Sequence, residues 1–158
     1  GKISAFDNIQ QNTIGGLVHE VFTNSLSHSI NHRYQKQNYT IAFPPKSHND
    51  EDIQFELYNG GIEVKTCLIK DGTKVRFVCK NPKIGYFMFA GFSPDYDRVY
   101  VAYGQTDEKV WNKAGRAFAN VNLEELAKAG LDTYYGSLQI DKSQNKTKVN
   151  CYSDKLGM

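Results

Sequence analysis

Apolar residues recur at spacings of three and four between residue 12 and about residue 34, which is the period of an α-helix. The positions are Ile14, Leu17, Val18, Val21, Phe22, Leu26 and Ile30. Gly15 and Gly16 lower helix propensity near the start but allow close packing. The pattern predicts a first helix, with Glu20 in its middle and close to the apolar stripe.

After this helix the pattern changes to the alternation of apolar and polar residues that is typical of β-strands. A short strand is expected at residues 39 to 43, and two prolines open the polar loop from 44 to 51. Alternation then runs from 52 to 57 and resumes at 62 to 65, after the Asn-Gly-Gly segment 59–61. Two such runs around a glycine-containing turn predict a β-hairpin.

More strands are predicted in the second half of the chain. Residues 67–69 and 75–78 form one expected strand pair. Residues 86–92 and 98–103 have nearly continuous apolar runs, which predict two buried strands at the centre of a sheet. A short helix is expected at residues 121–129, ended by a glycine in the C-cap position, Gly130.

The last segment, residues 131–158, is polar and lysine-rich, with one possible strand near 138–140 and no assigned role. This order of elements predicts the α/β or α+β class, with a mixed β-sheet flanked by helices. The length of 158 residues and an apolar fraction of 40% suit a single domain with one core. We therefore expect one domain over residues 1–158.

Composition narrows the class of protein only slightly. No stretch approaches the roughly 20 apolar residues that span a bilayer, so a soluble, cytoplasmic protein without membrane contact is expected. The three cysteines, Cys67, Cys79 and Cys151, have no CxxC spacing, so neither a disulfide framework nor a zinc site is indicated. The net charge of +2 leaves a nucleic-acid partner open, because a local basic face is what matters.

The candidate chemistry lies in the predicted hairpin. Glu63 and Lys65 are two residues apart, so their side chains leave the same face of one strand. Phosphodiester hydrolysis needs oxygen ligands for Mg²⁺ and a cation that balances charge developing on the phosphate. Glu63 supplies a ligand, Lys65 supplies the cation, and the carbonyl of Val64 between them is a further possible ligand.

A second acid is needed, and the preceding strand offers two, Asp52 and Glu56. A two-residue Asn59-Gly60 turn would put Glu56 directly across from Glu63, whereas a bulge at Gly61 or a splayed strand pair would bring Asp52 there instead. The residues alone leave this choice open.

These segments resemble the PD-(D/E)xK nuclease superfamily, whose best-known members are type II restriction endonucleases. The resemblance rests on residues 52–57, 59–61 and 62–66, and it covers about residues 12–130. It implies a restriction-endonuclease-like fold with Asp52 and Glu63 as metal ligands and Lys65 as a catalytic residue. It also implies a catalytic role for Glu20, in a helix with two glycines near its start. The chain departs from the pattern in having Glu51 rather than proline before the first acid, and Asp50 is a rival for that position.

The resemblance implies a Mg²⁺-dependent endonuclease that acts on double-stranded DNA as a homodimer, with Mn²⁺ as a substitute metal. Two alternatives stay open: a structure-specific nuclease, such as a junction resolvase or repair nickase, and a non-catalytic domain in which Glu63 and Lys65 form only a surface ion pair. The four histidines are expected to be solvated side chains, because no acid follows at zinc-ligand spacing. They are His19, His28, His32 and His48.

Overall fold

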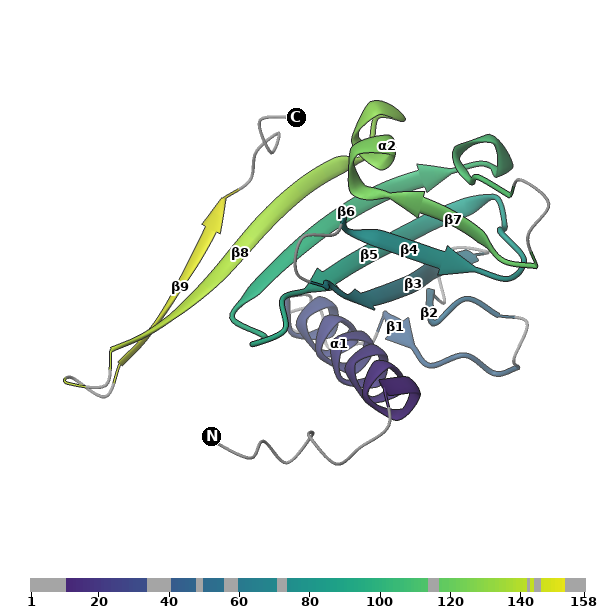
Figure 1. Ribbon diagram of the computed structural model, residues 1–158. Helices are drawn as coiled ribbons and strands as arrows, with labels where there is room; N and C mark the ends of the chain where they lie inside the picture. The colour runs from purple at the N-terminus through teal and green to yellow at the C-terminus, as the bar shows by residue number, and fades with distance from the viewer. Residues whose placement is uncertain are drawn as a thin grey trace. The chain divides into compact units, whose positions relative to one another are not determined.

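The computed structural model describes residues 11–33, 41–47, 50–55, 60–70, 74–113, 117–141, 143 and 146–152. The chain divides into two compact units, Gly1–Val64 and Lys65–Met158. The boundary falls inside strand β3 (Gly60–Leu68), whose backbone runs through it. The first unit contains α1, β1, β2 and the start of β3; the second contains the rest of β3, strands β4 to β9 and helix α2 (Figure 1).

Helix α1 (Gln11–Arg33) confirms the helix predicted from the three-and-four spacing. The side chain of Asn31, near the end of this helix, is hydrogen-bonded to the short strand β1 (Ala42–Phe43) and the residue before it. The Asn31 amide oxygen accepts from the N–H groups of Ile41 and Ala42 at 3.0 and 2.8 Å, and its nitrogen donates to the Ala42 carbonyl at 3.0 Å. This one side chain hydrogen-bonds β1 as a neighbouring strand would, which holds α1 against the strand.

The predicted hairpin forms, but its register differs from the one that a two-residue Asn59-Gly60 turn would give. Strand β2 (Ile53–Phe55) pairs antiparallel with β3, with Ile53 opposite Ile62 and Phe55 opposite Gly60. One step further along this register puts Asp52 opposite Glu63. Of the two alternatives, this register agrees with Asp52 rather than with Glu56, which a two-residue turn would have placed there; Glu56 itself lies outside the described residues.

Gly61 explains how β2 can approach in this register. A Cβ atom at position 61 would collide with the carbonyl oxygen of Ile53 and lie 2.9 Å from the Gln54 amide nitrogen. Only a residue without a side chain fits there. Gly61 is therefore required because two backbones approach each other closely, which is a known reason for a glycine within a strand.

The second unit has two sheets. Strands β5 (Gly85–Phe92) and β6 (Arg98–Thr106) confirm the two predicted central strands, because the strand order is β3-β5-β6-β8-β9. Strand β4 (Arg76–Cys79) pairs with β7 (Ala119–Asn122) in a separate two-stranded sheet. The predicted pairing of residues 75–78 with 67–69 is thus wrong, since β4 finds its partner more than forty residues later.

The last segment of the chain is more ordered than its composition suggests. Strands β8 (Asp132–Asp141) and β9 (Lys146–Tyr152) form a long antiparallel hairpin, where only one short strand near residues 138–140 was expected. Strand β8 also pairs with β6 along its first half. The segment therefore completes the main sheet of the second unit, as Figure 1 shows.

The core of the second unit lies between the β4–β7 sheet and the face of β5 and β6. Alternation along β4 buries one side of that strand, and the rings of Phe77, Phe87, Phe89 and Trp111 meet in this core. Their centroids lie 5.0 to 5.9 Å apart, within the range of favourable aromatic pairs. Burial of each such side chain stabilises the fold by roughly 1.5–3 kcal/mol, so this cluster is the main source of cohesion in the unit.

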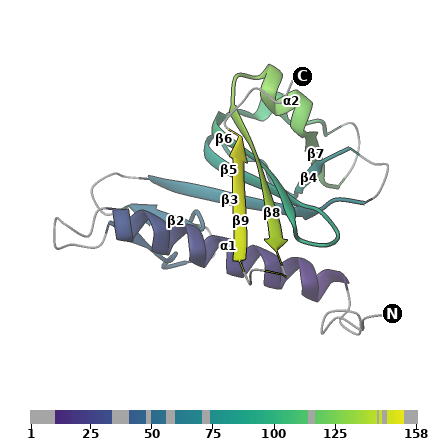
Figure 2. The same ribbon diagram turned by 90° about the vertical axis from the view of Figure 1, so that its left-hand side faces the viewer.

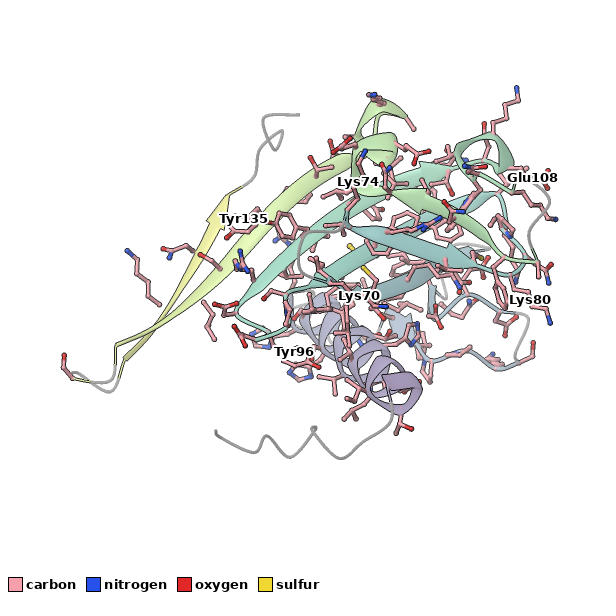
Figure 3. All side chains as sticks on the ribbon, viewed as in Figure 1. Lys70, Lys74, Lys80, Tyr96, Glu108 and Tyr135 are labelled. Carbon is pink, nitrogen blue, oxygen red and sulfur yellow. The ribbon has the colours of Figure 1, made fainter. Side chains whose placement is uncertain are left out.

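A 3₁₀ turn (Glu108–Val110) precedes Trp111, and helix α2 (Leu123–Lys128) follows β7. Asn122 and Glu125 form a capping box at the start of α2. Gly130 has φ +95°, and the N–H groups of Gly130 and Leu131 bond back to Ala127 and Leu126, which is a Schellman motif. The predicted helix and its glycine stop are confirmed. Lys74 lies 3.6 Å from Glu124 of this helix (Figure 3).

These elements make an α+β fold with a mostly antiparallel sheet and helices at its flanks. All six strand pairings with a described register are antiparallel, so the parallel pairs of a mixed sheet are not among them. The restriction-endonuclease-like core stays a prediction. In the described part of the chain, no helix combines the length and apolarity needed to cross a membrane.

The register of β2 on β3 can be tested at its two glycines. We expect Gly61→Ala to lower the free energy of unfolding by about 1–3 kcal/mol, because the new methyl group must push the Ile53 carbonyl away. Gly60→Ala is the matched control, since a Cβ atom there meets nothing within 4 Å. Urea unfolding of both variants measures the difference, and equal stability of the two would contradict the register.

Candidate metal-dependent active site

Two side chains hold the backbone of Val64. This residue of β3 lies two positions after Ile62, the last residue that pairs with β2. The Val64 N–H donates to Oδ2 of Asp52 at 2.8 Å, and Nε2 of His19 lies 3.0 Å from the Val64 carbonyl oxygen. Because a carbonyl oxygen only accepts, Nε2 must carry the proton and donate. An acid from the loop before β2 and a histidine from α1 therefore satisfy both backbone groups of one buried strand residue.

His19 and Asp52 also interact with each other. Nε2 of His19 lies 3.6 Å from Oδ2 of Asp52, and the two side chains are only 28% and 24% exposed. The interaction with Asp52 raises the pKa of His19 above 6.5, against the opposing effect of burial. The expectation that His19 is a solvated side chain is wrong, because it is half-buried and bonded to the candidate site.

Asp52 and Glu63 form the acid pair that the hairpin register brings together. Burial by itself would raise the pKa of Asp52, but hydrogen bonds from His19, from the Val64 N–H and with the Glu63 side chain lower it below 3.8. The register and these interactions place Asp52 next to Glu63.

Lys65 follows Glu63 along the same strand. In β3, Ile62 and Val64 are buried while Glu63 and Lys65 are half-buried, as strand alternation requires when two side chains leave one face. The predicted alternation is confirmed. Cys67 continues the series, and burial raises the pKa of its thiol to about 11. This cysteine is therefore a protonated packing residue.

The rival acids lie elsewhere or outside the described residues. Asp50 closes its own loop, since its Oδ2 accepts from the N–H groups of Lys46 and Ser47 at 3.0 and 2.9 Å. Asp52 is consequently the acid that meets Glu63. Glu20 is exposed on α1, one residue from His19, and its negative charge helps to raise the pKa of that histidine.

The remaining histidines differ from His19. His28 and His32 are exposed on α1, with their ring centroids 6.4 Å apart, and His48 lies outside the described residues. The sequence has no signal that separates His19 from the other histidines, because its contacts are with Asp52 and Val64, which lie far along the chain.

The comparisons add no relative. No protein-family model matches the chain, and neither the curated proteins nor the solved structures contain a match. Within the described residues, no group of three or more histidine, cysteine, aspartate or glutamate side chains is arranged to hold a metal ion. The candidate site therefore consists of two acids, Asp52 and Glu63, with His19 in contact with Asp52.

The contact between His19 and Asp52 predicts how stability depends on pH. Because the pKa of His19 is raised on folding, its contribution is fully present below pH 6.5 and is lost as pH rises through the higher folded value. We expect the free energy of unfolding, measured in EDTA, to fall as pH rises from 6.5. His19→Gln should remove this dependence.

His28→Gln is the matched control, since His28 is exposed on the same helix. Urea unfolding at pH 6 and at pH 8 measures both variants. If His19→Gln kept the dependence of the wild-type protein, the contact with Asp52 would not exist in solution.

Proposed function

We propose that this chain is a Mg²⁺-dependent endonuclease that hydrolyses phosphodiester bonds of double-stranded DNA. One observation carries the proposal: the register of β2 on β3 brings Asp52 beside Glu63, with Lys65 two residues further along the strand. The same three residues are those that the resemblance to PD-(D/E)xK nucleases implies. The acid pair and the lysine are the groups that metal-assisted hydrolysis of a phosphodiester requires.

The acid pair suits Mg²⁺ better than a metal that prefers histidine or cysteine ligands. Mg²⁺ keeps several of its water molecules and binds proteins through one or two carboxylates, so it needs no group of three protein ligands. Asp52 meets the Val64 N–H and His19 through Oδ2, which leaves the lone pairs of Oδ1 for Glu63 or a cation. A divalent cation would be held between these two carboxylates. Mn²⁺, with similar oxygen preference, is expected to substitute.

The protein's own residues have distinct roles in this proposal. Asp52 and Glu63 would hold the metal, which when bound would supply a water of lowered pKa and polarise the phosphate. Lys65 places a positive charge where negative charge develops on the phosphate oxygens. His19 is a positioning residue: it donates to the Val64 carbonyl and faces Asp52, so it keeps the acid in place on β3.

A homodimer would give two such sites, and two sites related by a two-fold axis cut both strands of a palindrome. A restriction enzyme is therefore the specific form of the proposal. Cleavage of plasmid into discrete fragments supports it. Preference for branched over linear duplexes favours a structure-specific nuclease such as a junction resolvase.

A non-catalytic domain is the second candidate, and one observation favours it. His19 already provides Asp52 with a cationic partner, and it also occupies the Val64 carbonyl that was expected as a further metal ligand. In that case the acids and the histidine stabilise the hairpin without a metal. Calorimetry with Mg²⁺ and Mn²⁺ distinguishes the two candidates, because only the nuclease takes up the metal.

Substitution of the three proposed active-site residues tests the nuclease directly. We expect Asp52→Asn, Glu63→Gln and Lys65→Ala each to lower the rate of Mg²⁺-dependent plasmid cleavage by roughly 10²–10³-fold, because each removes a metal ligand or the compensating charge. Lys128→Ala on α2 is the control, since Lys128 is an exposed lysine of the second unit. Cleavage by Lys65→Ala at the wild-type rate would make the assignment wrong.

The role that the resemblance implies for Glu20 is tested separately. Glu20 is exposed and acts on His19 through its charge, so we expect Glu20→Gln to lower the cleavage rate less than Glu63→Gln does. The ratio of the two rates, measured at saturating Mg²⁺, is the readout. A loss as large as that of Glu63→Gln would show that Glu20 binds the metal directly.

A further inference from the structure

The hairpin of β8 and β9 extends beyond the sheet to which it belongs. Strand β6 pairs with β8 only up to Ser137, which lies opposite Arg98. Beyond that point, the pairs from Leu138 opposite Val149 to Asp141 opposite Lys146 belong to a ribbon of two strands alone. Figure 1 shows this part projecting away from β6, and Figure 2 shows its two strands side by side. We call the paired residues 138–141 and 146–149, together with the sequence that joins them, the arm.

The base of the arm is firmly attached to the sheet. The rings of Tyr100 and Tyr135 lie 4.9 Å apart where β8 runs beside β6, and Tyr135 is marked in Figure 3. The N–H of Leu138 donates to the Asp97 carbonyl at 2.7 Å. The arm therefore begins at a defined point. Beyond it, a two-stranded ribbon in water is marginally stable, which favours a partner that covers it.

The charge of the arm indicates the kind of partner. Its twelve residues include Lys142, Lys146 and Lys148, with Asp141 as the one acid. The chain has 19 basic and 17 acidic residues. Three of the basic residues and one of the acidic residues lie in the arm, so the rest of the chain has sixteen of each. The whole net charge of +2 thus equals that of the arm. Lys148 is exposed.

We propose that the arm enters the major groove of duplex DNA and that its lysines neutralise phosphates beside the groove. This rests on the proposed function, which makes duplex DNA the substrate. The major groove admits a two-stranded β-ribbon and is about 8.5 Å deep. At about 3.4 Å per residue, the four residue pairs of the arm beyond β6 span roughly 10–14 Å, enough to reach the groove floor.

Two variants of the full chain test the arm. In the first, an Asn-Gly turn replaces residues 139–148; it closes the pair of Leu138 and Val149 with a two-residue loop and keeps every β6–β8 pair. In the second, Lys142, Lys146 and Lys148 become glutamine. The matched control changes Lys109, Lys113 and Lys128 to glutamine, which alters the net charge equally outside the arm.

Fluorescence anisotropy of a labelled mixed-sequence duplex in EDTA, between 50 and 200 mM KCl, measures binding without cleavage. We expect both arm variants to raise Kd at least about tenfold and to lower the slope of log Kd against log salt by about one for each lysine that contacts a phosphate. The control should keep the wild-type slope. Equal effects of arm and control substitutions, or wild-type binding by the shortened arm, would overturn the proposal.

A second copy of the chain is the other occupant that the test distinguishes. Sedimentation of the wild-type protein and the shortened variant gives their oligomeric states. If shortening converts a dimer into a monomer while duplex affinity is unchanged, the arm joins protomers and the groove proposal fails. The proposed nuclease fails on a different result, absence of Mg²⁺-dependent cleavage by the wild-type protein, and the arm's effect on binding would stand without it.

Discussion

The candidate site depends on how the backbone of Val64 is satisfied. Strand β3 continues past the end of β2, so the N–H and carbonyl of this buried residue have no strand partner on that side. An unpaired backbone group away from water destabilises the fold. In this protein Asp52 accepts from the Val64 N–H, and His19 donates to the Val64 carbonyl. A requirement of the backbone therefore draws an acid and a histidine together, from segments more than thirty residues apart.

The same arrangement determines which acid meets Glu63. Once Ile53 lies opposite Ile62, the residue before Ile53 must lie opposite the residue after Ile62. Gly61 permits that register because no side chain intervenes between the two backbones. Asp52 is then held by two donors, His19 and the Val64 N–H, so its pKa is lowered although it is half-buried. Its ionised form suits a metal ligand and also suits an ion pair with His19.

The second unit is stabilised mainly by the burial of apolar side chains. Aromatic rings from β4, β5 and the segment after the 3₁₀ turn pack between two sheets, and a capped helix closes one end. The hairpin of β8 and β9 begins in this packed sheet and ends outside it. Its excess of lysines means that the small net charge of the chain is unevenly spread, and a local basic element is the form of charge that DNA recognition uses.

The sequence by itself determined the local structure where one period dominates. The helix 11–33, the strands β5 and β6, the helix after Asn122 with its glycine stop, and the shared face of Glu63 and Lys65 all follow from spacing and from turn chemistry. The tertiary structure alone decided three things: the choice of Asp52 over Glu56, the pairing of β4 with β7, and the contact of His19 with Asp52. Each depends on register or on partners distant along the chain, and alternation with a period of two carries no information about which strand lies opposite which.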